Sequence, residues 1–418
     1  MSVALPDKVH RFAERMLPYS IYAFMVLYPF SVKWANFSIL VLCALGLLSN
    51  PLSAKVKKAK ASKALWLYPA YYGVLLIGML YSEDRRYAFK ILETGIYFLL
   101  FPVLFATAAT LNAKALRTIG ILLVATTCGA AVYCLVQNVL HFHANDISFD
   151  RFFTWEYSYS NLTRYIGLHP TYFAAVTLLA FFTLLLRGDF STVPNKVVYG
   201  FILLFLFVFL ILLGAKIGLV IFFVVALALA FVYKLNSRRQ LLVRVGGIVL
   251  LLVAAYNTPV IYWRFKSAFD GVVHAASGRD GAADYRTLHW GCAAGVIRES
   301  PWVGHGIGDV QARMNACYEG LGRLEELRNY SAHNQYLDVW AKVGLLGLGI
   351  TLLCLVSPLY QSLKTRDLLF SIAFFVFLAV CLTECFLNVQ KGVTLFCFVA
   401  SLYWGHIHHQ HQPGKLTA

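Results

Sequence analysis

A series of long apolar runs, separated by short charged gaps, constrains the fold of this chain more than any other feature. The runs are about 17–22 residues long, the length with which an α-helix crosses a bilayer. Of the 418 residues, 59% are hydrophobic and 13% are charged, whereas soluble domains contain about 45–50% and about 25%. The sequence therefore predicts an all-α polytopic membrane protein.

About twelve runs have this character, and we expect as many transmembrane helices. The expected spans cover residues 16–32, 34–50, 64–81, 91–111, 118–141, 170–187, 197–215, 217–234, 245–262, 338–360, 368–386 and 392–408. The seventh and eighth runs are broken only at residues 214–218, so they form either two spans or one kinked helix. A single kinked helix would invert the topology of everything that follows.

The basic residues in the short gaps indicate the orientation of the chain. Lysines cluster at residues 55–63, and basic residues recur at 234–244. With twelve spans these gaps fall on the side of both termini, which the positive-inside rule identifies as cytoplasmic. The net charge of +16 therefore reflects topology, and no aromatic-basic motif for nucleic acid accompanies it. We expect membrane lipids, but no nucleic acid, among the partners.

Polar residues on the opposite side concentrate in one large loop, which divides the chain into three parts. Residues 1–262 carry spans one to nine, residues 263–333 form the outer loop, and residues 334–418 carry spans ten to twelve with a short cytoplasmic tail. Helical spacing of apolar residues predicts helices over 284–297 and 311–328. Cys292 and Cys317 also lie in this loop, where they either pair in an oxidising compartment or remain two free thiols.

The motif Ser331-Ala332-His333-Asn334-Gln335-Tyr336 ends the outer loop. Helical spacing places His333 on one face with Tyr336, and Ser331 or Asn334 could cap the helix that follows. Histidine suits a general base because its unperturbed pKa, about 6.5, lies near working pH. The same residue could instead be a hydrogen-bonded histidine at the membrane interface. We expect the loop chemistry to centre on His333.

Cationic residues gather in the outer segments. Arg286 is either an ordinary loop arginine or a phosphate ligand, for which the guanidinium fork is suited. Lys216 sits between two glycines at the break near residue 215, where it either snorkels to the interface or marks a site. The other candidates for binding an anionic substrate are Arg164, His169, Arg86 and Lys90.

Carboxylates are scarce in the same segments, and no D-x-D pair is present. A sugar transferase that uses a divalent metal needs such ligands, whereas cationic side chains can themselves neutralise a leaving group. We therefore expect no metal and no cofactor. The run Gly304-His305-Gly306-Ile307-Gly308 predicts a turn where backbone can approach a ligand closely, but no strand precedes it, as a nucleotide motif would require.

Four motifs together resemble the O-antigen ligase and polymerase superfamily of bacterial membrane glycosyltransferases. The resemblance covers most of the chain, including the number of spans and the single large loop before the third-last span. The motifs are Gly167-Leu168-His169-Pro170-Thr171-Tyr172, Arg286 and Trp290 with residues 301–308, His333-Asn334-Gln335-Tyr336 with residues 344–347, and Glu384 with Gln390-Lys391-Gly392.

The resemblance implies a GT-C-like helical fold in the bacterial inner membrane, with both termini cytoplasmic and the active site periplasmic. The donor would be undecaprenyl-pyrophosphate-linked glycan, the acceptor lipid A–core, and the reaction inverting and metal-free. The resemblance also implies that Arg286 binds the donor pyrophosphate and that His333 is the general base. We expect Asn334 and Tyr336 to help bind substrate. The family usually has an arginine where this chain has Lys216, and lysine lacks the bidentate fork.

Two alternative functions stay open. A polymerase of the same superfamily shares the fold and the large loop, although the motifs at 304–308 and 333–334 fit the ligase branch better. A secondary transporter also suits twelve spans with a broken helix. However, the two halves of the chain show no obvious internal repeat, and a transporter has no need for the large polar loop.

Overall fold

The computed structural model describes residues 6–108, 111–148, 151, 154, 157–232, 237–263, 265–266 and 285–410, with the backbone alone at 408–410. Every regular element within these residues is a helix, which confirms the all-α prediction. Residues 264 and 267–284 of the predicted outer loop, and the tail at 411–418, lie outside the described residues. The chain forms two compact units. The first comprises Met1–Leu122 and Arg286–Ala418, and the second comprises Leu123–Tyr285.

Each of the twelve predicted apolar runs is largely helical, but the run at 91–111 is divided between α5 (Arg85–Gly95) and α6 (Tyr97–Thr107). Among the described residues, seven helical segments are long and apolar enough to cross a membrane. The number is eight if α2 (Val32–Leu48) and α3 (Leu52–Ala61), which are bent by 108°, count as one span. Two shorter apolar helices, α11 (Lys216–Val232) and α18 (Leu368–Cys381), accompany them. The chain is a multi-pass membrane protein, and the count of twelve stays a prediction.

The first unit combines helices from both ends of the chain. Buried aromatic rings join them: the Phe24 ring of α1 lies 5.1 Å from the Phe398 ring of α19, which lies 5.6 Å from the Phe101 ring of α6. Its helices are α1 (Asp7–Leu27), α2 (Val32–Leu48), α3 (Leu52–Ala61), η1 (Lys63–Trp66), α4 (Leu67–Leu80), α5 (Arg85–Gly95), α6 (Tyr97–Thr107), α14 (Tyr285–Glu299), α15 (Val310–Gly320), α16 (Leu324–Leu327), α17 (Gln335–Lys364), α18, η5 (Phe386–Asn388) and α19 (Gln390–Gln410).

The three helices of the outer loop form a subdomain of their own, the α14–α16 subdomain. Apolar side chains of α14 and α15, among them Val296 and Met314, are buried in its core. A disulfide between Cys292 and Cys317 joins α14 to α15, which settles the question that the sequence left open. The helix predicted over 284–297 is confirmed by α14. The one predicted over 311–328 is wrong in its continuity, because the chain turns at Gly322 (φ +66°) between α15 and α16.

Helix α17 is broken near its start, at Val343 and Gly344, which have non-helical backbone angles. The segment that follows α14 forms backbone hydrogen bonds with the break, so the carbonyl and N–H groups freed there keep partners. The bonds are His305 N–H to Ala341 O at 2.9 Å, Gly306 N–H to Lys342 O at 2.9 Å and Leu345 N–H to Trp302 O at 3.3 Å.

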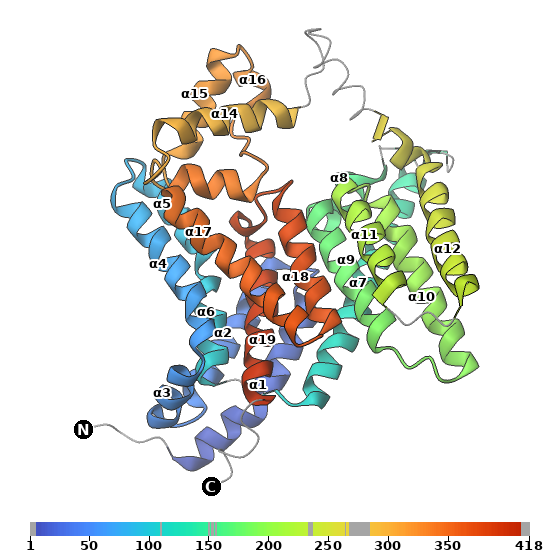
Figure 1. Cartoon of the computed structure of the whole chain (residues 1–418), viewed down its shortest axis with the longest axis horizontal. Helices are drawn as coiled ribbons and strands as arrows, with labels where there is room; N and C mark the ends of the chain where they lie inside the picture. Colours follow the sequence, from blue (N-terminus) through green and yellow to red (C-terminus); the bar gives the residue numbers. More distant parts are fainter. Residues whose placement is uncertain are drawn as a thin grey trace. The chain divides into compact units, whose positions relative to one another are not determined.

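The α14–α16 subdomain and the basic helix α3 lie at opposite ends of the first unit (Figure 1). Helix α3 carries Lys55, Lys57, Lys58 and Lys60. Helix α5 and the first part of α17 lie at the same end as the subdomain (Figure 1). One end of the first unit is therefore strongly basic, and α17 begins at the other end.

The second unit contains the hairpin predicted as two spans or one kinked helix. Helix α10 (Val193–Leu212) ends at a turn with Gly214 in the left-handed region (φ +58°), and α11 begins at Lys216. The Phe207 ring of α10 lies 4.8 Å from the Phe222 ring of α11, so the two helices fold back on each other. The remaining helices are α8 (Tyr159–Thr163), η4 (Arg164–Ile166), α9 (Pro170–Arg187) and α12 (Arg238–Tyr256), while α7 (Ala113–Ala144) crosses the unit boundary.

Candidate active site

His333 directly precedes Asn334, the N-cap residue of α17. Its backbone adopts a conformation that residues other than glycine rarely adopt. Its φ of +45° is in the left-handed region. The Asn334 side chain caps the helix by accepting from the N–H groups of Tyr336 at 3.0 Å and Leu337 at 3.1 Å. Of the two predicted caps, Ser331 and Asn334, the structure therefore has Asn334. The helix therefore begins at Gln335, and the prediction that His333 shares a helical face with Tyr336 is wrong. The His333 side chain is 28% exposed.

A buried carboxylate meets His333 from a distant part of the chain. Glu384 lies between α18 and η5, and its side chain is only 9% exposed. Its Oε2 lies 3.2 Å from Nδ1 of His333. An ionised carboxylate can only accept a hydrogen bond, so neutral His333 carries its proton on Nδ1 and keeps a lone pair on Nε2. A histidine held in this way by a third group can take up a proton at Nε2.

Arg286 meets the same carboxylate from the start of α14. Its Nη2 lies 3.9 Å from Oε1 of Glu384, within the range of an ion pair. The guanidinium has five N–H donors, and 39% of the side chain is exposed. Glu384 therefore brings together the two residues that the sequence predicted to be catalytic, and one face of Arg286 is accessible to an anion.

Two aromatic residues complete the surroundings of His333. His289, which is only 2% exposed, follows Arg286 by one helical turn of α14. Its ring centroid lies 5.2 Å from that of His333, and it stacks on Tyr330 at 5.5 Å and 13°. The Tyr330 ring lies 5.8 Å from His333. The sequence analysis gave no role to His289, and it named Glu384 only as part of a motif. Two features of the sequence could have pointed to them. His289 lies three residues after Arg286, and Glu384 is a lone carboxylate at the end of an apolar run.

A buried polar network ties the start of α17 to the segment after Glu384. The Gln335 side chain accepts from Leu387 N–H at 2.7 Å and donates to Asn388 Oδ1 at 3.1 Å. Asn388 Nδ2 and Lys342 Nζ each donate to Asp338 Oδ2 at 2.7 Å. Removing one partner of a buried ion pair costs about 3–5 kcal/mol. The network thus holds the two segments that carry the candidate site at a fixed separation.

Glycines of the run at 304–308 pack against Ser82 and Asp84. A Cβ added to Gly308 would lie 2.2 Å from the carbonyl oxygen of Asp84, and one added to Gly306 would lie 2.5 Å from Oγ of Ser82. Gly308 N–H also donates to Ser82 Oγ at 3.0 Å. The expectation that this run lets a ligand approach the backbone is therefore wrong, because protein atoms occupy the space that these glycines leave.

Asn334 and Tyr336 have structural partners. The Asn334 side chain serves as the cap of α17, and the Tyr336 hydroxyl donates to the carbonyl of Leu378 at 2.9 Å. Both bonds lie within the first unit and account for these polar atoms without a ligand. A role for either residue in substrate binding stays a prediction.

The other predicted cations lie on α5 of the first unit and on or beside helices of the second unit. Arg86 and Lys90 are exposed on α5, one helical turn apart, and α5 packs against η5 and α19. In the second unit, Lys216 is the first, half-buried residue of α11. Arg164 is exposed there and rests on the Tyr165 ring, 4.8 Å from its centroid. His169 caps α9, accepting from Thr171 N–H at 3.3 Å, and its ring contacts Tyr159 and Tyr172.

Within the described part of the chain, no group of three or more His, Cys, Asp and Glu side chains is arranged to hold a metal ion. The expectation of a reaction without metal or cofactor stays a prediction.

Comparisons with known proteins find two similarities. A family model described as O-antigen ligase matches residues 201–352, a range that includes Lys216, Arg286 and His333. An uncharacterized protein of Haemophilus influenzae is 26% identical over 180 residues, which cover 41% of this chain. The match spans 45% of that relative, less than half of its length. Over residues 201–352, the chain is therefore similar to the O-antigen ligase family.

Proposed function

We propose that this protein is an O-antigen ligase, which transfers O-antigen polysaccharide from undecaprenyl pyrophosphate to a sugar hydroxyl of lipid A–core. The observation that carries the proposal is the convergence of His333 and Arg286 on the buried carboxylate of Glu384. A base held by a carboxylate, beside an exposed guanidinium, suits attack of a hydroxyl on a sugar linked to pyrophosphate. The family match supports a ligase-like or polymerase-like transfer of lipid-linked glycan.

In the proposed reaction, Nε2 of His333 takes the proton of the acceptor hydroxyl. The acceptor oxygen forms a bond to the anomeric carbon while the bond from that carbon to the pyrophosphate oxygen breaks, with inversion. Glu384 stabilises the imidazolium that results, because it already accepts the Nδ1 proton. General base catalysis of this kind contributes about 10²–10⁴-fold to a rate.

The pyrophosphate leaves with its negative charge, which Arg286 is placed to bind. A guanidinium binds two phosphate oxygens at once, and the exposed part of Arg286 gives access to them. Lys216, Arg164, His169, Arg86 and Lys90 are proposed as further binding residues, with Asn334 and Tyr336 beside the base. Cationic side chains in these roles would make the transfer independent of metal.

The first unit supports the proposed orientation. Its α3 lysines and its α14–α16 subdomain lie at opposite ends (Figure 1), as expected if the lysines face the cytoplasm. The disulfide of the subdomain fits an oxidising compartment. We therefore place the active site at the periplasmic face of the inner membrane, with both termini cytoplasmic, in a GT-C-like fold of twelve spans with 263–333 as the periplasmic loop.

A reconstituted transfer reaction tests the proposal. Purified protein in liposomes would receive undecaprenyl-pyrophosphate-linked glycan, with and without lipid A–core, and the products would be resolved on a gel. The ligase proposal predicts a shifted lipid A–core band for the wild type and for the control His143→Ala, an exposed histidine of α7, but none for His333→Ala. Longer lipid-linked glycan without any need for lipid A–core would identify a polymerase. No product of either kind from monodisperse wild-type protein would contradict a glycosyltransferase.

A further inference from the structure

The segment that delivers His333 contains two residues in the left-handed region, Asn329 with φ +65° and His333 with φ +45°. Residues other than glycine rarely adopt this conformation, and they keep it where surrounding contacts determine it. Most of the contacts that hold residues 329–333 come from side chains, so they can be identified and removed one at a time.

Helix α15 presents three polar side chains to this segment. Gln311, Asn315 and Tyr318 are spaced by four and three residues, which places them on one face of the helix. Asn315 accepts from Asn329 N–H at 2.9 Å and donates to Asn329 Oδ1 at 3.2 Å. Gln311 Nε2 and the Tyr318 hydroxyl each donate to the carbonyl of Tyr330 at 3.2 Å. We call these three residues the α15 clamp.

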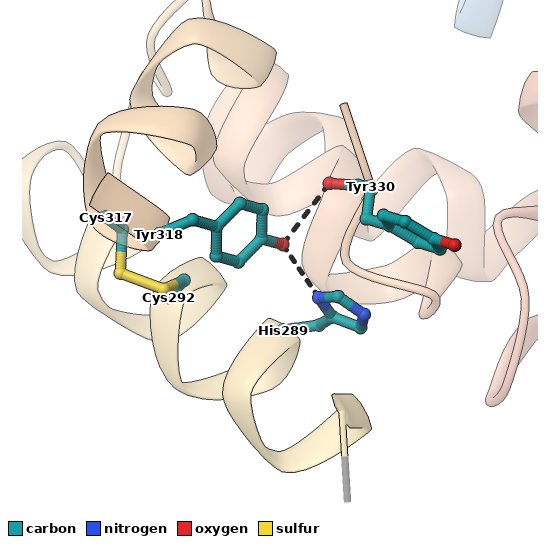
Figure 2. Close-up of a disulfide and its surroundings, with 5 residues drawn as sticks. All are labelled: His289, Cys292, Cys317, Tyr318 and Tyr330. Carbon is teal, nitrogen blue, oxygen red and sulfur yellow. Dashed lines mark hydrogen bonds between the residues drawn. A yellow bond between two sulfur atoms is a disulfide. The ribbon is translucent and has the colours of Figure 1, made fainter. Parts of the chain in front are cut away.

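The Tyr318 hydroxyl also connects the clamp to α14. A hydroxyl has one proton, and the Tyr330 carbonyl can only accept it. The contact of 2.9 Å between the Tyr318 oxygen and Nδ1 of His289 therefore has Nδ1–H as its donor. Burial raises the pKa of Tyr318 above its ordinary value, so the hydroxyl keeps its proton at physiological pH. Figure 2 shows the Tyr318 hydroxyl between His289 and the Tyr330 carbonyl.

The disulfide fixes the two helices from which these groups come. Cys292 follows His289 by three residues on α14, and Cys317 directly precedes Tyr318 on α15 (Figure 2). Tyr318 is fully buried in the apolar core that contains the disulfide. Helix α15 is therefore held as a rigid support, and its polar face determines where the backbone of residues 329–330 lies.

We propose that Tyr318 is a positioning residue of the transfer reaction. With Gln311 and Asn315 it holds the backbone before His333, so that His333 reaches Glu384 in the orientation that leaves Nε2 as the base. The proposal rests on the proposed function for its effect on rate, but its structural part is independent of any activity. No substrate contact is assigned to Tyr318.

Hydrogen–deuterium exchange on the full-length protein in detergent tests the structural part. Tyr318→Phe keeps the buried ring and removes the hydroxyl. A peptide covering residues 328–334 should then exchange about tenfold faster, the effect of losing roughly one net hydrogen bond. The matched control is Tyr81→Phe, which removes a tyrosine hydroxyl that donates to the Val303 carbonyl at 2.8 Å. This control should leave the 328–334 peptide unchanged.

Kinetics of the same variants test the catalytic part. Tyr318→Phe should lower kcat about 2- to 10-fold with an unchanged KM for the donor, because the base is misplaced while the pyrophosphate site is intact. Asn315→Ala, which removes the other arm of the clamp, should reproduce both effects. Wild-type exchange of 328–334 in Tyr318→Phe and Asn315→Ala would overturn the proposal. Faster exchange with unchanged kcat would overturn its catalytic part, and faster exchange in a protein without transfer activity would contradict only the proposed function.

Discussion

Two segments flank the first part of α17, and they are held in different ways. Residues 301–309 are fixed to α17 largely by backbone hydrogen bonds, and to residues 82–84 by glycine contacts and the Asp309 carboxylate. Residues 329–333 are held mainly by side chains of α15 and end at His333. The first segment therefore acts as a rigid attachment of the α14–α16 subdomain. The second presents a reactive side chain whose position depends on individual hydrogen bonds, so the two should respond differently to substitution.

The largest effect is expected where the first segment meets the break of α17. Gly344 has φ +65°, and a Cβ there would lie 2.0 Å from the carbonyl oxygen of Trp302. We predict that Gly344→Ala destabilises the protein by about 2–6 kcal/mol, since backbone strain and overpacking each cost about 1–3 kcal/mol. Thermal unfolding followed by tryptophan fluorescence or by aggregation in detergent would measure the change.

The control for this substitution is Gly349→Ala on the same helix. A Cβ at Gly349 meets nothing within 4 Å, and alanine favours a helix over glycine by about 0.5–1 kcal/mol. The control should therefore be neutral or slightly stabilising. Equal stability of the two variants would show that the break does not depend on the attachment of residues 301–309.

The next largest effect is expected for a substitution of Arg286, which lies in the candidate site with His333 of the second segment. Arg286→Lys keeps the charge but loses the fork that binds two phosphate oxygens. We expect kcat/KM for the donor to fall about tenfold, the loss of about one charge-assisted hydrogen bond. Arg313→Lys, on the exposed arginine that pairs with Glu299 at 3.0 Å, should have no effect. Wild-type kinetics for Arg286→Lys would remove bidentate binding from the proposal.

The smallest effect is expected at Asp309, in the first segment. Its two carboxylate oxygens accept from Glu83 N–H at 2.9 Å and Asp84 N–H at 2.8 Å. Asn has one carbonyl oxygen, so Asp309→Asn should cost about 1 kcal/mol of stability and leave the transfer rate unchanged. A loss of rate without a loss of stability would mean that the first segment also controls the site, and the contrast between the segments would fail.

The sequence predicted the parts of the molecule that depend on local pattern. Apolar runs located the helices, and the spacing of apolar residues located α14 over 284–297. The break in the predicted helix at 311–328 was not foreseen, although Gly320 and Gly322 supplied a local signal. The break of α17 at Gly344 was also missed, because the Trp302 backbone that packs against Gly344 comes from a distant segment of the chain.

The site was predicted residue by residue but not as an arrangement. His333 and Arg286 were identified from their residue types and from the family resemblance. Glu384 was not assigned, because 51 residues separate it from His333 and only the fold brings them together. The left-handed conformation of His333 was also hidden, since side-chain contacts from α15 accompany it and no local motif encodes it.

We infer that Glu384 fixes the proton of His333 on Nδ1 and so makes Nε2 the base. Single-turnover transfer rates, measured under identical conditions for the wild type and for Glu384→Gln, test this inference most directly. In Glu384→Gln the rate should fall about 10- to 150-fold, the effect of a hydrogen bond to a charged group. A wild-type rate in Glu384→Gln would contradict the inference.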